Sequence, residues 1–273
     1  MKTMLVAVLA VAGAGSAAVS GSVVESDQGA LELARSAIAE MRQLRKADQG
    51  VCEADGEVLR YIGRTETDLL VCLERHPDAS ILRVTSSGGP VRRAIPAARE
   101  LARREMSVEV LGFCGSSCGN YVLPAAREFV VLPYSAVMLH GAPKPDLGQD
   151  RERLVKAIKK SGFPPEKITE ELIAEQLQGL SDERRMHVQF QQDFAVGQGW
   201  YELPFYYQAV ERAEGEGAIL FVSEDFAAQC LGKATEIAAF WEPGNETEEA
   251  AFRDLFNYRV WIVGRDVGAP ADC

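Results

Sequence analysis

A pair of serines, Ser116 and Ser117, stands at the place in this sequence best suited to nucleophilic chemistry. A strand-like apolar run, 107–111, leads into Gly112, and the small residues of 117–126 can begin a helix after the serines. A strand that turns sharply into a helix lifts a serine hydroxyl out of the sheet, and the free N–H groups of the first helical turn can stabilise an oxyanion. The pattern predicts acyl transfer at this corner, with Ser116 as the candidate nucleophile and Ser117 as the alternative.

The other groups that acyl transfer needs stand at the ends of neighbouring strand-like runs. His140 ends the run 136–139 and is the candidate general base. Gly89 follows the run 81–85, and because it has no side chain its backbone N–H can face a ligand. The N–H groups of Gly89 and Ser117 are therefore the predicted oxyanion hole. Each residue alone is typical of a turn or a helix cap. Their coincidence at successive strand ends, where α/β sheets bind ligands, indicates a site.

Strand-like and helical patterns alternate along the chain, which predicts an α/β fold of βαβ units with a mainly parallel sheet. The predicted strands are 57–63, 81–85, 107–111, 128–132, 136–139, 218–222, 237–241 and 258–263. The predicted helices are 27–47, 65–75, 90–104, 117–126, 150–160, 166–178, 182–196, 205–213, 224–231 and 246–255. His187, in one of the polar helices, is expected at the surface.

The N-terminus has the pattern of a secretory signal: a lysine, a short apolar run and then small residues. We therefore expect an exported, periplasmic or secreted protein, with a retained membrane anchor as the alternative. The predicted divisions are a signal peptide at 1–20, an N-terminal helix at 21–50, a core at 51–143, a helical insertion at 144–204 that flanks or covers the site, and the C-terminal part of the core at 205–273.

The charge and the cysteine content of the chain limit which partners and cofactors are expected. The net charge is −11 and no basic stripe stands out, so nucleic acid is not an expected partner. The six cysteines are even in number, and this favours disulfides in an exported chain. They show no zinc-ligand spacing to histidines, so no metal and no cofactor are predicted.

Cys114 and Cys118 bracket the serine corner, and a disulfide that clamps it is the predicted pairing, with two reduced structural thiols as the alternative. Cys52 with Cys72, and Cys230 with Cys273, are the simplest remaining pairs.

The segment 81–143 resembles the Clp protease proteolytic subunit and the wider crotonase-like superfamily. The resemblance rests on four pieces, T-S-S-G-G-P-V, G-F-C-G-S-S-C-G, A-A-R-E-F-V-V and V-M-L-H-G-A-P, and the C-G-S-S-C corner is similar to that of exported bacterial members with C-x-S-x-C. The resemblance implies a crotonase-like core, and its register counted from Gly112 implies Ser116 as nucleophile, with His140, Gly89 and the Ser117 N–H in the roles given above. The family assembles into rings and trimers, which implies a homo-oligomer.

The chain departs from the family pattern at the acid that would orient the histidine. That position holds Ile219, and the third triad member is unknown. The carboxylates that could stand in are Glu214, Glu216, Asp182 and Asp193. The sequence therefore predicts an exported serine hydrolase of the peptidase type, acting on a peptide or small acyl substrate. The alternative is a non-catalytic binding or assembly module that kept the fold without the acid.

Overall fold

The structure is a computed structural model of the chain and describes residues 27–65, 69–139, 143, 151–202, 218–232, 234–256, 259–263, 265–266, 268 and 273. The predicted signal peptide and the predicted helix 205–213 lie outside these residues.

Nine strands form one mixed, mainly parallel sheet in the order β1-β2-β3-β4-β6-β7-β9, and β5 and β8 branch from β4. The strands are β1 (Val51–Asp55), β2 (Val58–Gly63), β3 (Ile81–Ser86), β4 (Ser107–Gly115), β5 (Glu128–Val131), β6 (Ala136–Met138), β7 (Ala218–Phe221), β8 (Glu236–Phe240) and β9 (Arg259–Ile262). Among the described strands, only the β1–β2 and β6–β7 pairs are antiparallel. The α/β class and the mainly parallel sheet are confirmed. β1 was not predicted.

β4 is the strand from which the sheet divides. Its first half pairs with β5, from Val108 to Val110, and its second half pairs with β6, from Phe113 to Gly115. The division falls at Gly112, which has a φ of +74°, and its N–H donates to the hydroxyl of Ser135 over 2.7 Å. The sequence predicted that the strand ends before Gly112, and this was wrong. The side-chain acceptor satisfies the glycine's N–H where the ladder changes partner, so the strand continues to the serine corner.

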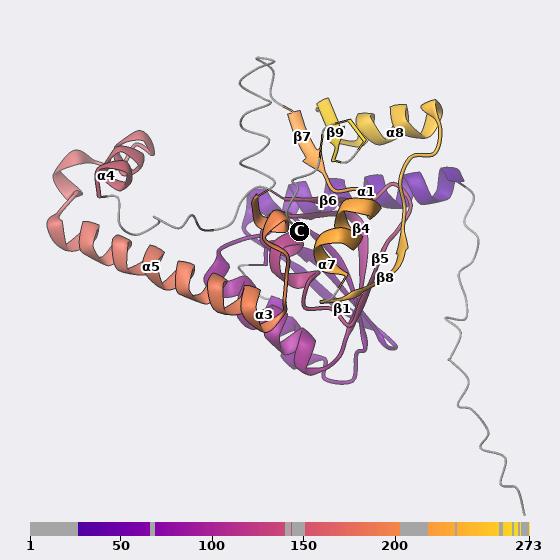
Figure 1. Cartoon of the computed structure of the whole chain (residues 1–273), viewed down its shortest axis with the longest axis horizontal. Coiled ribbons are helices and arrows are strands. Elements are labelled where there is room, and N and C mark those ends of the chain that lie inside the picture. The colour runs from indigo at the N-terminus through magenta and orange to yellow at the C-terminus, as the bar shows by residue number, and fades with distance from the viewer. Residues whose placement is uncertain are drawn as a thin grey trace, which may run out of the picture.

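Helices cover both faces of the sheet (Figure 1). They are α1 (Asp27–Ala47), α2 (Leu69–Arg75), α3 (Val91–Arg103), α7 (Glu224–Leu231) and α8 (Glu246–Phe256), with a short π-helix, η1 (Cys118–Val122). One core cluster joins α1 and α8 to the sheet, and the larger cluster lies under α2, α3, η1 and α7. α1 packs closely against Gly112: a Cβ atom placed on this glycine would lie 3.0 Å from Cγ1 of Ile38 in α1. The absence of a side chain at 112 thus brings the N-terminal helix against the centre of the sheet.

The helical stretch in the second half of the chain consists of α4 (Arg151–Lys160), a 3-10 turn, η2 (Pro165–Lys167), and α5 (Glu170–Asp193), followed by helical residues 198–202. The C-terminal half of α5 lies against α3, and its N-terminal half extends away from the sheet with α4 (Figure 1). The sequence predicted separate helices at 166–178 and 182–196, but one helix continues through Gly179. A glycine inside a helix costs only about 1 kcal/mol, and the helix-forming residues around it offset that cost.

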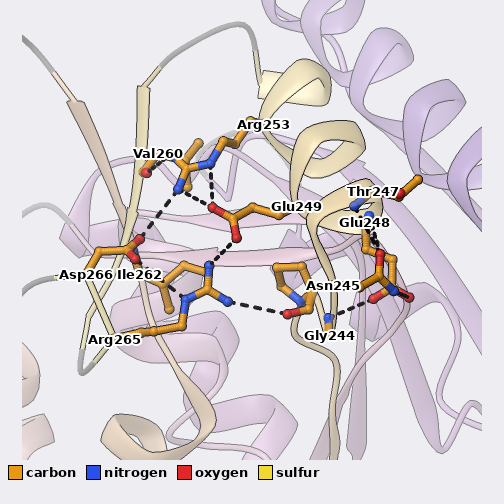
Figure 2. Close-up of polar contacts among 11 residues, drawn as sticks. Gly244, Asn245, Thr247, Glu248, Glu249, Arg253, Val260, Ile262, Arg265 and Asp266 are labelled. Carbon is orange, nitrogen blue, oxygen red and sulfur yellow. Dashed lines mark hydrogen bonds and ion pairs between the residues drawn. The ribbon is translucent and has the colours of Figure 1, made fainter.

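The C-terminal strand is held by a network of ion pairs that Figure 2 shows. Arg253 on α8 bonds to Glu249 over 2.5 Å and donates to the carbonyl of Val260 on β9 over 2.6 Å. Glu249 also accepts from Arg265 over 3.0 Å, and Asp266 accepts from the N–H of Ile262 over 2.9 Å. This network joins α8 to β9 and to the turn that follows it.

Three disulfides are present: Cys52–Cys72, Cys114–Cys118 and Cys230–Cys273. These are the pairs that the sequence analysis favours, and three disulfides are typical of an oxidising compartment. Among the described residues, no helix is both long and apolar enough to cross a membrane.

Candidate functional site at the Ser116 corner

Ser116 occupies the turn between β4 and η1 in a left-handed backbone conformation, with a φ of +57°. A non-glycine residue in this region carries strain of about 1–2 kcal/mol. Two backbone hydrogen bonds hold it there: its N–H donates to the carbonyl of Met138 over 2.9 Å, and its carbonyl accepts from the N–H of Asn120 over 2.8 Å. Ser116 is partly exposed although its neighbours are buried. The corner therefore presents one strained serine at the edge of a packed core.

The glycine loop after β3 packs directly against this corner. A Cβ on Gly88 would lie 2.5 Å from Cβ of Ser116 and 2.7 Å from the backbone nitrogen of Ser117, so only glycine fits there. Gly88 itself has a φ of +81°, and its N–H donates to the hydroxyl of Ser86 over 3.1 Å. Its carbonyl accepts from the N–H of Thr65 over 3.1 Å.

The Ser117 hydroxyl joins this loop to η1. It is buried and donates to the carbonyl of Gly89 over 2.5 Å. The bond connects the two segments that carry the predicted oxyanion donors.

The backbone N–H groups of Gly89 and Ser117 have no hydrogen-bond acceptor among the described residues. Ser117 is the N-cap residue of η1, Gly89 directly precedes Pro90, the N-cap residue of α3, and neither helix has a side-chain cap. Uncapped N–H groups at a helix start are free to bind an oxygen that carries negative charge. The two donors therefore lie on adjoining segments at the edge of the corner.

Two aromatic residues of the segment 198–202 donate hydrogen bonds to backbone carbonyls of η1. The indole N–H of Trp200 donates to the carbonyl of Gly119 over 3.2 Å, and the hydroxyl of Tyr201 donates to the carbonyl of Asn120 over 3.1 Å. Both side chains are buried. These bonds satisfy carbonyls of a π-helix, an irregular turn that often occurs at functional sites. The sequence predicted a break at 197–204, but residues 198–202 are helical, and the adjacent aromatic residues Trp200 and Tyr201 were the signal in the sequence for a buried segment there.

The Cys114–Cys118 disulfide spans the corner from the end of β4 to the first residue of η1, with a Cα–Cα distance of 5.3 Å. Both cysteines are fully buried. Since the crosslink encloses Ser116, it limits how far the strand and the helix can separate at the nucleophile position.

The predicted base, His140, lies outside the described residues, but Leu139, which precedes it, packs against η1. Leu139 packs so near Gly119 that a Cβ there would lie 2.9 Å from Cδ2 of the leucine. On the other side, Arg184 of α5 donates to the carbonyl of Pro143 over 2.7 Å. Among the described residues, no histidine or carboxylate bonds to the Ser116 hydroxyl.

Of the carboxylates considered as the third residue, the two that the structure describes, Asp182 and Asp193, are both paired with arginines. Glu214 and Glu216 lie outside the described residues. Asp193 pairs with Arg99 over 2.5 Å, and hydrogen bonds from Arg99 and Gln189 lower the pKa of its carboxyl. Asp182 pairs with Arg185 within its own helix. The family's acid position, Ile219, lies in β7 beside β6.

His187 is buried, at 2% exposure, and the prediction that it lies at the surface was wrong. Its Nδ1 lies 3.2 Å from the hydroxyl of Tyr121, which belongs to η1, and its ring meets the ring of Tyr201 edge-on. Burial, with a smaller effect of the Arg184 charge, lowers the pKa of His187 to about 4. The imidazole is therefore neutral at pH 7. The spacing of His187 and Phe190, three residues apart on one helix face, was the signal of burial in the sequence.

Glu183, one turn before His187, is also close to this cluster and was not singled out from the sequence. Burial raises the pKa of its carboxyl, and the charge of Arg92 on α3 partly opposes this. Glu183 also acts on Tyr121, whose pKa is raised mainly by burial. α5 thus places two titratable side chains, Glu183 and His187, close to Tyr121 of η1.

Among the described residues, no group of three or more His, Cys, Asp or Glu side chains is arranged to hold a metal ion. The fold and site define an α/β protein with a mainly parallel mixed sheet and a strained serine at a strand–helix corner. No protein-family model matches this sequence, and comparison with the curated proteins finds none of significant similarity. The resemblance to the Clp protease and crotonase-like proteins stays a prediction.

Proposed function

We propose that this chain is an exported serine hydrolase of the peptidase type, with Ser116 as nucleophile and His140 as general base. The observation that carries the proposal is the φ of +57° at Ser116, on a partly exposed residue between a strand and a helix. Strained serines at such corners are typical of nucleophiles, since the turn raises the hydroxyl above the sheet. Three disulfides support the export part of the proposal.

In the proposed reaction, the Ser116 hydroxyl attacks the carbonyl carbon of a peptide or small acyl substrate while His140 takes its proton. The N–H groups of Gly89 and Ser117 stabilise the oxyanion, and His140 then protonates the leaving group. An acyl-enzyme ester at Ser116 remains, and water activated by His140 hydrolyses it. The fixed donors are the main source of rate, because they need no reorganisation when charge develops.

The contacts at the corner favour Ser116 over Ser117 as nucleophile. The Ser117 hydroxyl is buried and donates to the carbonyl of Gly89, so its hydrogen already has an acceptor. Ser116 uses only backbone atoms in its described hydrogen bonds, which leaves its hydroxyl for a substrate.

A non-catalytic peptide-binding module is the second candidate, and the residue at the acid position favours it. Ile219 replaces the carboxylate, and the described alternatives, Asp182 and Asp193, pair with arginines elsewhere. A serine–histidine pair without its orienting acid loses most of its rate. Such a protein would bind an extended ligand at the corner and turn it over slowly or not at all.

Labelling with a fluorophosphonate probe separates the two candidates. We expect the folded wild-type protein to be labelled stoichiometrically and the Ser116→Ala variant not at all. Ser117→Ala should still be labelled, more slowly, because it loses the bond that holds the glycine loop. Labelling that survives Ser116→Ala would refute the nucleophile assignment. Absence of labelling in folded wild-type protein would favour the binding module.

A further inference from the structure

The two glycines between β3 and α3 have almost all of their polar backbone groups occupied. The N–H of Gly88 donates to the Ser86 hydroxyl over 3.1 Å, and its carbonyl accepts from the N–H of Thr65 over 3.1 Å. The carbonyl of Gly89 accepts from the Ser117 hydroxyl. The Gly89 N–H is the one group of the four that has no partner among the described residues. The loop therefore leaves a single donor for a ligand, and it is the predicted oxyanion donor.

The Ser86 hydroxyl is an acceptor in a fixed position. Ser86 is the last residue of β3 and lies between β2 and β4, in register with Gly63 and Cys114. Its side chain has 0% exposure, and Gly88 is also buried. A buried N–H needs an acceptor, because leaving it unpaired costs more free energy than the bond contributes. The hydroxyl thus ties the first glycine of the loop to the centre of the sheet.

A second buried serine holds a glycine in the same way elsewhere in the sheet. The hydroxyl of Ser135 accepts from the N–H of Gly112, whose φ of +74° is close to the +81° of Gly88. The two glycines differ in what they pack against. A Cβ on Gly88 would lie 2.5 Å from Cβ of Ser116, whereas a Cβ on Gly112 would meet α1. The Ser135 bond therefore has the same chemistry as the Ser86 bond but does not reach the glycine loop.

We propose that Ser86 is a positioning residue of the oxyanion site: its hydroxyl holds the Gly88 N–H, so that the Gly89 N–H is the donor the loop presents to the substrate oxygen. The inference rests on the proposed function for the reaction at the corner, and it concerns a side chain that acts through the loop. Without the hydroxyl, the Gly88 N–H must turn to another acceptor, and two glycines offer little resistance to that change. The Gly89 N–H then loses its fixed direction, on which oxyanion stabilisation depends.

The first test does not depend on catalysis. Amide hydrogen exchange, followed by NMR, is measured for Gly88 in the wild type, in Ser86→Ala and in Ser86→Thr. We expect the Gly88 amide to exchange about tenfold faster in Ser86→Ala, because it loses its acceptor. Ser86→Thr keeps a hydroxyl and should exchange nearly as slowly as the wild type. Unchanged exchange of Gly88 in Ser86→Ala would overturn the inference, since the hydroxyl would then not hold the loop.

The second test is the rate of fluorophosphonate labelling and the ³¹P resonance of the labelled protein. In Ser86→Ala labelling should slow about tenfold, and the resonance should shift because the phosphoryl oxygen loses a fixed donor. Ser86→Thr should restore both. Ser135→Ala removes an equivalent bond, so it should lower stability similarly but keep the wild-type rate and resonance.

Two results of the second test would overturn the inference. One is a wild-type rate with an unshifted resonance in Ser86→Ala. The other is equal slowing and an equal shift in Ser135→Ala, which would show that loss of stability alone explains the effect. Failure of the proposed hydrolase function would appear separately, as absence of labelling in the wild type, and the exchange of Gly88 would still show whether Ser86 holds the loop.

Discussion

The backbone N–H of Ser116 donates to the carbonyl of Met138 over 2.9 Å, so the corner residue is bonded to the last residue of β6. This bond continues the parallel pairing between the ends of β4 and β6. It places the chain leaving β6 beside the candidate nucleophile, and His140 is the second residue after Met138 in the sequence.

The contact between Gly88 and the corner gives a first prediction. Gly88→Ala should destabilise the protein by about 2–4 kcal/mol, because a methyl group would overlap backbone atoms of the corner and strain a residue with positive φ. Chemical unfolding in urea measures the change, and fluorophosphonate labelling should slow in the folded fraction.

Gly162 provides a matched control for that substitution. Its φ is +80°, almost the same as that of Gly88, but nothing lies within 4 Å of the Cβ it would carry. Gly162→Ala should therefore lower the free energy of unfolding only by the strain of a positive φ in alanine, about 1 kcal/mol. It should leave the rate of labelling unchanged. Equal effects of the two substitutions would show that packing at the corner is not what requires Gly88.

The disulfides make a second prediction. Removing either of two disulfides should lower the free energy of unfolding, but only one removal should change the geometry at Ser116. Loop-closure entropy gives about 2 kcal/mol for the short Cys114–Cys118 loop and about 3 kcal/mol for Cys52–Cys72, whose sequence separation is 20. Replacing each pair by alanines should reduce labelling of Ser116 only for the 114–118 pair. If loss of Cys52–Cys72 slowed labelling as much, the clamp would have no special role at the corner.

The aromatic support of η1 makes a third prediction. Tyr201→Phe removes a hydrogen bond to the carbonyl of Asn120 and should cost about 1 kcal/mol of unfolding free energy. It should also slow labelling, because η1 carries the Ser117 N–H. Tyr134→Phe is the control, since it removes a 2.8 Å bond to Asp27 on the other face of the sheet and should leave labelling unchanged. Equal labelling rates in both variants would argue that this bond does not position the corner.

The buried His187 makes a fourth prediction, about pH. Its pKa is lowered to about 4 in the folded protein, against about 6.5 in the unfolded chain. Between these values the unfolded chain binds a proton that the folded protein does not, so the free energy of unfolding should fall as the pH is lowered from 6.5 towards 4. The loss assigned to this residue is about 3 kcal/mol at most.

Urea unfolding of wild type and His187→Gln across this pH range isolates the effect. Glutamine keeps a polar partner for Tyr121 but does not titrate, so its stability should change less with pH than that of the wild type. The imidazole contacts Tyr121 and Tyr201, and Arg184 and Glu183 are the nearby charged residues on α5. Burial raises the pKa of the Glu183 carboxyl, but this group is present in both proteins, so the difference between their pH curves reports His187. Parallel pH curves for the two proteins would contradict a neutral, buried His187.

Much of the fold could be predicted because local patterns carry it. α1 was predicted with its observed bounds, and so was α7, whose first turn is capped by the Ser223 hydroxyl, which accepts from the N–H of Phe226 over 3.2 Å. Predictions failed where a distant partner decides the outcome. β4 continues past Gly112 because Ser135 satisfies its N–H, and His187 is buried because α5 lies against η1. Ser135 is far in sequence from Gly112, and Tyr121 is far from His187. The hydrophobic periodicity of a sequence carries information only about residues that are close together in the chain.

The sequence by itself determined the strand–helix alternation, the serine corner with its flanking cysteines, and the absence of a carboxylate at position 219, since these are properties of residue type and local spacing. Only the tertiary structure decided that Gly88 packs against Ser116, that Ser117 bonds to Gly89, and that Trp200 and Tyr201 hold η1. The physical reason is that the left-handed strain at Ser116 persists only where surrounding contacts hold it in place. Those contacts come from segments that meet only when the sheet has formed.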